Sequence, residues 1–221
     1  MSLMDTFFGG GVSPRLALGV AAGSYVLGCF STGYYLVRLR TGQDIRELGS
    51  GSTGARNVGR VLGRRGFLWT AAGDLVKGAL AVWLALVLTG GNDRVAMLAW
   101  LAVVIGHIWP AQLGLRGGKG VSTSLAGLLI YDWRLALIYV LFYLTGLALT
   151  RRSVAASLAG YMLLPGAAYF WLGLDETQIW GISVLAGLIL LAHHRNVVEG
   201  MAEWWSRRGM GGESDRSVKE S

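Results

Sequence analysis

Two glycine-rich segments of the chain carry residues suited to holding phosphate. The first, residues 42–65, has spaced glycines interleaved with hydroxyl side chains: Gly49, Ser50, Gly51, Ser52, Thr53 and Gly54. Glycines let backbone N–H groups converge on an anion, and a helix that begins near Ala55 would point its positive end at the same place. Arg46 and Arg56 add guanidinium groups whose planar fork suits phosphate. The segment therefore predicts a phosphate site, the alternative being a loop whose arginines only orient the protein.

The second segment, residues 106–124, contains Gly117, Gly118, Lys119 and Gly120 in a row. It differs from the P-loop template, in which four residues separate the first glycine from Gly-Lys and a Ser or Thr follows the lysine. A lysine between glycines at the start of a helix still favours phosphate binding, the alternative for Lys119 being a charged anchor at the membrane surface. For His107, at the head of the segment, packing and a functional role both stay open.

Two smaller polar groups complete the candidate chemistry. His193 and Asn196 are three residues apart and would share one face of a helix. We expect no metal there, because neither an H-x-x-x-H pair nor a cysteine partner is present. Asp74 and Lys77 lie one turn apart inside an apolar run, where an ionisable pair is a functional-site hypothesis by default. A self-neutralising pair that faces the protein interior is the alternative.

The composition indicates what must position these residues. The chain has 221 residues, of which 53% are hydrophobic and only 15% charged, and its mean hydropathy is +0.48. A soluble domain would carry about 25% charged residues, and a disordered chain would be more polar still. The single cysteine, Cys29, excludes an intrachain disulfide framework. These values predict an integral membrane protein.

Seven uncharged runs are candidates for membrane spans, and they lie at residues 16–37, 67–90, 95–113, 121–131, 135–150, 154–174 and 179–192. If the N-terminus lies outside, all but three of the 20 basic residues fall in inner segments or close to them, and only Arg15, Arg94 and Arg134 are outer. We therefore predict an all-α bundle of seven transmembrane helices with a cytoplasmic C-terminus and both glycine-rich loops on the cytoplasmic side. Residues 1–208 would form one domain and 209–221 a disordered tail. The flanking membrane helices also exclude a dinucleotide-binding fold for the first glycine string.

The motifs resemble those of the bacterial membrane glycerol-3-phosphate acyltransferases that take the acyl group from acyl phosphate. The likeness covers about residues 20 to 200. It is carried by the following residues: Gly23-Ser24-Tyr25, Gly28, Thr32-Gly33-Tyr34, Asp44-Ile45-Arg46-Glu47, Gly49-Ser50-Gly51, Gly54-Ala55, Asn57-Val58, Asp74, Lys77-Gly78, Gly106-His107-Ile108, Pro110 and Gly117-Gly118-Lys119-Gly120-Val121.

This resemblance implies transfer of a fatty acyl group to the 1-hydroxyl of sn-glycerol 3-phosphate, with lysophosphatidic acid and phosphate as products. It implies an enzyme of the inner membrane that acts in phospholipid biosynthesis without a cofactor, metal or nucleic acid, supplied by a soluble acyl-phosphate synthase. The implied catalytic residues are Lys119, His193, Asn196 and Ser50. The implied phosphate-binding residues are Arg46, Gly49, Gly51, Ser52, Gly54, Asn57, Gly117, Gly118, Gly120, Lys77 and His107. The base is His193 or a phosphate oxygen of the substrate, and the alternative function is a transporter or binding protein for a phosphate ester or anionic lipid.

The chain also departs from the family pattern. Ser52-Thr53 replaces the usual Asn-Pro, and Arg56 replaces a threonine. The third motif usually reads His-Arg-x-Asn. Either His193 and Asn196 match it and His194 replaces the arginine, or His194-Arg195 matches it and the asparagine is lost. We prefer the first alignment because it keeps the helical pair. A serine expected near Ala155 is missing, whereas Ser157 is present.

Overall fold

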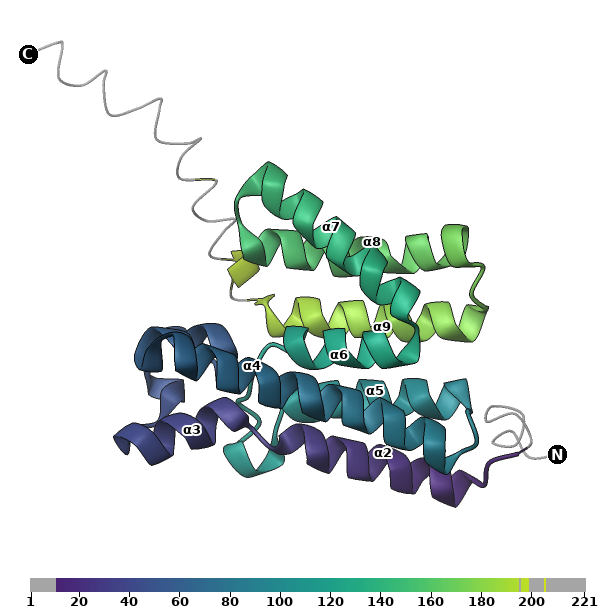
Figure 1. Ribbon diagram of the computed structural model, residues 1–221, viewed down its shortest axis with the longest axis horizontal. Coiled ribbons are helices and arrows are strands. Elements are labelled where there is room, and N and C mark those ends of the chain that lie inside the picture. Colours follow the sequence, from purple (N-terminus) through teal and green to yellow (C-terminus); the bar gives the residue numbers. More distant parts are fainter. Residues whose placement is uncertain (1–10, 195, 199–204, 206–221) are drawn as a thin grey trace, which may run out of the picture.

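The computed structural model describes residues 11–194, 196–198 and 205, and the regular structure of these residues is entirely helical (Figure 1). The helices are α2 (Pro14–Cys29), α3 (Thr32–Thr41), α4 (Ala55–Leu88), α5 (Asp93–Ile108), α6 (Val121–Tyr131), α7 (Trp133–Thr150), α8 (Ser153–Leu172) and α9 (Glu176–Ala192), with short 3₁₀ turns at Ile45–Glu47 and Ala111–Leu113. The predicted all-α class is confirmed. The predicted tail 209–221 lies outside the described residues.

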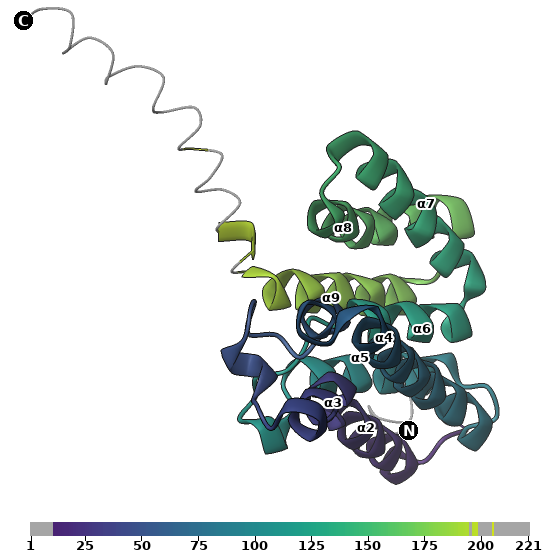
Figure 2. The same ribbon diagram turned by 60° about the vertical axis from the view of Figure 1, so that its left-hand side comes forward.

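The helices lie in three layers (Figures 1 and 2). Helices α2, α4 and α5 form the first layer, α6 and α9 the second, and α7 and α8 the third. Contacts join α2 to α5, α4 to α6, and α7 to α8. The largest fully buried side chains are Trp100 of α5 and Tyr161 of α8, whereas many apolar side chains point outward, as a lipid-facing surface requires.

Five helical segments of the described chain are long and apolar enough to cross a membrane: Pro14–Thr41, Ala55–Leu88, Asp93–Leu113, Trp133–Thr150 and Ser153–Leu172. The other two predicted spans are shorter apolar helices. At 1.5 Å per residue, the 11 residues of α6 measure about 16 Å and the 17 residues of α9 about 25 Å, against a hydrocarbon core of about 30 Å. Helix α6 is therefore too short to span that thickness by itself.

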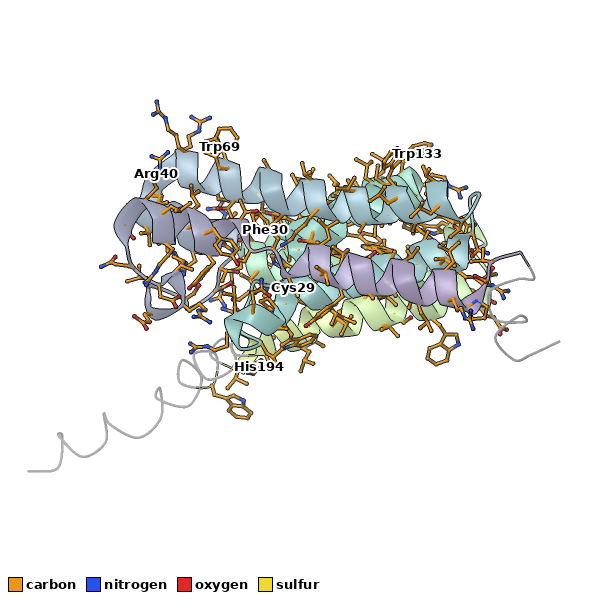
Figure 3. All side chains as sticks on the ribbon, turned by 90° about the horizontal axis from the view of Figure 1, so that it is seen from below. Cys29, Phe30, Arg40, Trp69, Trp133 and His194 are labelled. Atoms are coloured by element: carbon orange, nitrogen blue, oxygen red, sulfur yellow. The ribbon has the colours of Figure 1, made fainter. Side chains whose placement is uncertain are left out.

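The run predicted as one span over 16–37 is interrupted, because α2 ends at Cys29 and α3 begins at Thr32. The carbonyl groups freed at the break have polar partners from elsewhere in the chain. Lys77 Nζ donates to the carbonyl oxygens of Gly28 at 3.1 Å and Phe30 at 2.8 Å. Gln112 Nε2 donates to the carbonyl of Cys29 at 2.5 Å. Side chains of other segments therefore hold the break between α2 and α3 in place. Figure 3 shows Cys29 and Phe30 at this point.

The helix expected near Ala55 and the span expected from residue 67 form one kinked helix, α4. Gly63 has a φ of 68° and interrupts the helical geometry. A Cβ on Gly59 would lie 3.0 Å from the Cβ of Phe67, which shows that the segment before the kink lies against the start of the segment after it. The short segment carries the first glycine-rich loop, and the long one enters the bundle.

Glycines set the close helix crossings, as is common where membrane helices pack without a hydrophobic driving force. A Cβ on Gly78 of α4 would overlap the backbone carbonyl of Thr123 of α6. A Cβ on Gly28 of α2 would overlap the backbone of Val103 of α5. The first of these crossings fixes α6, whose N-terminus lies within the second glycine-rich segment.

We expect Gly78→Ala to lower the melting temperature of the purified protein, because α6 must move to admit the methyl group. Such overpacking costs about 1–3 kcal/mol, more than the roughly 1 kcal/mol that alanine gains over glycine in a helix. Gly187→Ala in α9 is the matched control, since a Cβ at that position would meet no atom within 4 Å. Thermal unfolding followed by tryptophan fluorescence compares the two, and equal melting temperatures would contradict the packing argument.

Candidate active site

The structure brings the two glycine-rich segments together at one end of the bundle. The backbone N–H of Thr53 donates to the carbonyl oxygen of Gly117 at 3.3 Å. Arg46 reinforces this junction, because its Nη1 donates to the carbonyl of Leu113 at 2.5 Å. Segments about 65 residues apart in sequence therefore form one surface.

The first segment is organised around the buried side chain of Asn57. Its Oδ1 accepts the N–H of Ser50 at 3.0 Å. Its Nδ2 lies within hydrogen-bond distance of the carbonyl oxygens of Leu48 at 2.8 Å and Ser52 at 2.9 Å, with that of Ile45 at 3.3 Å. Asn57 thus fixes the loop from inside, while Ser50 is exposed at its surface.

The backbone conformation of this loop requires glycine at positions 49 and 51. Gly49 and Gly51 have φ angles of 54° and 67°, in the left-handed region that other residues rarely adopt. Gly54 is the N-cap residue of α4, and its N–H group donates a hydrogen bond to Ser52 Oγ at 3.2 Å. The N-terminus of α4 follows directly at Ala55, as the sequence predicted, so the N–H groups of its first turn lie beside the loop.

The second glycine-rich segment packs closely against His107. The N–H groups of Gly117 and Gly118 donate to the carbonyl oxygens of Ile108 and His107, both at 3.0 Å. A Cβ on Gly118 would overlap the imidazole of His107, and one on Gly117 would overlap its carbonyl oxygen. Gly120 has a φ of 81° and is the N-cap residue of α6. Each of these glycines therefore has a steric or conformational reason to be glycine.

The third predicted motif joins the same surface. Lys119 Nζ donates a hydrogen bond to Oδ1 of Asn196. His193, at the end of α9, is buried, and its Nδ1 lies 2.8 Å from the carbonyl oxygen of Ile189. His194 is exposed. These placements support the alignment in which His193 and Asn196 match the family motif, while Arg195 lies outside the described residues.

The contacts of His193 determine which of its ring nitrogens carries hydrogen and in which direction its pKa moves. A carbonyl oxygen only accepts, so Nδ1 carries the hydrogen and Nε2 of the neutral ring keeps its lone pair. Burial lowers the pKa of His193, and the positive charges of Lys119 and Arg56 lower it further, although the bond to Ile189 raises it. His193 is therefore neutral at neutral pH, with Nε2 able to accept a proton. Arg56 lies in the first turn of α4, three residues after Thr53, whose N–H group donates to the second glycine-rich segment at Gly117.

Three of the predicted phosphate ligands, Arg46, Lys77 and His107, lie beside carboxylates of the protein itself. Arg46 binds both carboxylate oxygens of Asp44 through Nε and Nη2, at 2.6–3.1 Å, and this bond lowers the pKa of Asp44. Lys77 Nζ contacts Asp74 at 3.1 Å in addition to the two carbonyls at the helix break. His107 Nδ1 lies 3.4 Å from the same carboxylate. Lys77 and His107 are both buried. Arg46 joins the two loops and His107 packs under Gly118, whereas Lys77 holds the break between α2 and α3.

A group of arginines adjoins the site, and of these the sequence analysis assigned only Arg56 to phosphate binding. An open groove of about 310 Å³ runs along the first turns of α4, and its lining residues are Arg56, Gly59, Arg60, Gly63, Arg64 and Phe67. The signal was present in the sequence, because arginines recur at 56, 60 and 64. Arg56 and Arg60 lie one turn apart on α4, and Arg64 lines the same groove from beyond the kink at Gly63. Arg60 and Arg64 appeared there only as charges that orient the bundle.

The described residues contain no cluster of three or more His, Cys, Asp or Glu side chains that could hold a metal ion. The arrangement consists instead of backbone N–H groups, a lysine, arginines and a neutral histidine. Such a set binds phosphate groups and stabilises negative charge that develops during acyl transfer.

Comparison with known proteins gives a consistent result. A family model described as glycerol-3-phosphate acyltransferase matches residues 18–203. The chain is 46% identical over 186 residues to glycerol-3-phosphate acyltransferase 1 of Desulfitobacterium hafniense (strain Y51), covering 84% of this chain and 91% of that protein. It is 40% identical to the glycerol-3-phosphate acyltransferase of Gloeobacter violaceus, covering 83% and 90%.

The fold is also similar to the crystal structures of PlsY, an integral membrane glycerol 3-phosphate acyltransferase. The glycerol 3-phosphate form superposes with a TM-score of 0.78 at 29% identity, covering 85% of this chain and 93% of that one. The lysophosphatidic acid form gives 0.76 at 27% identity, with the same coverage. The match along almost the whole length, with the predicted motifs gathered at one surface, shows that the chain belongs to the glycerol-3-phosphate acyltransferase family.

Proposed function

We propose that this chain transfers a fatty acyl group from acyl phosphate to the 1-hydroxyl of sn-glycerol 3-phosphate. Family membership supports the acceptor and the product. The observation that carries the donor is that the two glycine-rich segments meet at Thr53 and Gly117, two residues before Lys119, whose ammonium group contacts Asn196. The reaction has to hold one phosphate on each substrate. The permease alternative does not account for a neutral histidine beside that convergence.

We further propose that all seven apolar segments lie in the bacterial inner membrane, with the N-terminus outside and the site at the cytoplasmic face. Figure 3 supports the direction, since Arg40 and His194 lie towards one end of the bundle and Trp133 towards the other. Basic residues favour the cytoplasmic side. A soluble acyl-phosphate synthase would then deliver the donor from the cytoplasm to the same face.

The reaction needs no covalent intermediate, because acyl phosphate is already a mixed anhydride. The glycerol hydroxyl oxygen attacks the acyl carbon, the new ester C–O bond forms, and the bond from that carbon to the phosphate oxygen breaks. Lys119 stabilises the charge on the departing phosphate. The N–H groups of the first loop, together with Ser50, hold a phosphate group, and Asn196 helps to orient the acceptor. The hydroxyl proton passes either to Nε2 of His193 or directly to a phosphate oxygen of the donor.

The donor assignment is tested with the purified chain in nanodiscs and labelled glycerol 3-phosphate. We expect labelled lysophosphatidate with palmitoyl phosphate and none above background with palmitoyl-CoA. Sealed vesicles that contain the chain provide the second arm. Uptake of labelled glycerol 3-phosphate without product would overturn the enzyme assignment and favour transport.

The two proton routes predict different pH profiles. If Nε2 of His193 accepts the proton, the profile of kcat/KM has an acid limb below the usual histidine value of about 6.5, because burial and two nearby cations lower its pKa. Arg56→Gln removes one of those cations, so the pKa of His193 rises and the limb moves to higher pH. An acid limb that is unchanged in both Arg56→Gln and His193→Gln would assign the proton to the phosphate oxygen.

A further inference from the structure

Lys119 is connected to helix α6 by a single residue, Gly120, which is the N-cap residue of that helix. The chain before Lys119 is fixed by the N–H groups of Gly117 and Gly118, which donate to carbonyl oxygens at the end of α5. The chain after it depends on α6, which has only 11 residues, about three turns. Contacts that hold the first turn of α6 therefore also set where the ammonium group of Lys119 lies.

The side chain of Tyr161 contacts this first turn through both functions of its hydroxyl group. The hydroxyl of Ser124 donates to Tyr161 Oη at 2.6 Å. Tyr161 Oη donates in turn to the carbonyl oxygen of Val121 at 3.3 Å. Because a phenolic hydroxyl carries one proton and also accepts, Tyr161 joins the first and fourth residues of α6 in one set of hydrogen bonds.

These hydrogen bonds connect two layers of the bundle. Tyr161 lies on α8 in the third layer, whereas α6 lies in the second (Figure 1). Tyr161 is only 1% exposed and Ser124 is fully buried, and hydrogen bonds are stronger in such surroundings than in water. From the first layer, Trp100 of α5 donates through Nε1 to the carbonyl oxygen of Ser124 at 3.1 Å. The start of α6 is thus held by polar contacts from both sides.

A second tyrosine, Tyr139 of α7, shows what is particular to Tyr161. The two rings are in contact, with their centroids 4.4 Å apart. Tyr139 is also buried, but its hydroxyl pairs with Ser157 Oγ at 2.8 Å. That hydrogen bond joins α7 to α8. Within the described part of the chain, only the Tyr161 hydroxyl of this pair bonds to α6.

We propose that Tyr161 is a positioning residue for acyl transfer. Its hydroxyl holds the first turn of α6 and so keeps the ammonium group of Lys119 in place for the departing phosphate, a role that rests on the proposed function. Without that hydroxyl, the side chain of Ser124 turns to the carbonyl oxygen of Gly120, four residues before it, as serines inside helices do. Such a bond bends the helix directly beside Lys119.

Tyr161→Phe tests this role, because it removes the hydroxyl and keeps the ring. Tyr139→Phe is the matched control, since it removes a buried hydroxyl from the adjacent ring. We expect similar falls in melting temperature for both. Only Tyr161→Phe should lower kcat with acyl phosphate, by about tenfold and with the KM for glycerol 3-phosphate unchanged, because a small displacement of a reacting group lowers the rate steeply. Ser124→Ala breaks the same contact from α6 and should lower kcat in the same way.

Hydrogen–deuterium exchange gives a readout that needs no activity. Amides in the peptide that spans residues 119–128 should exchange faster in Tyr161→Phe than in Tyr139→Phe, because the start of α6 opens more readily. Equal exchange and equal kcat in these two variants would overturn the proposal and leave Tyr161 with a packing role alone.

A double variant shows whether Tyr161 acts through Lys119. In the Lys119→Met background, Tyr161→Phe should lower kcat no further, because the group that it positions is gone. Losses that multiply would overturn the proposal. If Lys119→Met alone retains kcat while the exchange of residues 119–128 still differs, the proposed role of Lys119 fails but the anchoring of α6 by Tyr161 stands. Failure of the proposed function and failure of this inference are therefore separate results.

Discussion

Lys119→Met is expected to lower kcat for acyl transfer from acyl phosphate by about two to three orders of magnitude, the range typical for removal of a group that stabilises developing charge. Lys119 follows Gly117 and Gly118, whose N–H groups donate to the carbonyls of Ile108 and His107, and its ammonium group contacts Asn196. Methionine keeps the length and apolar character of the stem but removes the charge, so the departing phosphate has no counter-charge.

Arg116→Met is the control for this variant. Arg116 is exposed in the same segment, and its loss changes the net charge equally. We expect its kcat to stay within about twofold, since surface charges contribute little at a distance. Lys119→Arg should retain part of the activity, because it keeps the charge but not the compact ammonium group. A Lys119→Met protein that melts normally and retains kcat would remove Lys119 from the chemistry.

Much of the site could be predicted because its signals are local. The two glycine strings and the His193–Asn196 pair are each contained in a few residues. All the glycines of the strings except Gly54 are required by φ angles or close contacts. The membrane class followed from composition alone. What these patterns do not contain is how the segments meet, for example the hydrogen bond from Thr53 to Gly117.

The features that sequence analysis missed depend on residues far apart in the chain. The break between α2 and α3 falls within an uncharged run, so hydropathy gives no sign of it. It depends on Lys77, 47 residues away, and on Gln112, 83 residues away. Arg46 shows a second limit. An arginine beside a glycine loop predicts a phosphate ligand, yet here its guanidinium group binds Asp44 and Leu113 and so ties two loops together.

Asn57 illustrates the same limit and supports the second large effect. In sequence it appears as one more phosphate ligand, but its side chain is buried and faces the loop's own backbone. We expect Asn57→Ala to reduce kcat/KM by about a hundredfold, because a well-positioned loop is worth several kcal/mol when it orients a substrate. The unpaired carbonyls and the N–H of Ser50 would reorient towards water and no longer converge on phosphate.

Asn57→Asp makes this test sharper, since the carboxylate has almost the same shape as the amide. It keeps an acceptor for the N–H of Ser50 but places a negatively charged oxygen against the carbonyls of Leu48 and Ser52, where Nδ2 donated. If Asn57 acts by organising the loop, the isosteric Asp is as damaging as Ala, while Gln43→Ala, an exposed change in the same segment, has little effect. If Asn57 only helps to fill space, Asp retains most of the activity. Steady-state kinetics with acyl phosphate, together with melting curves that exclude global unfolding, decide between these roles, and the KM for each substrate identifies which phosphate the loop holds.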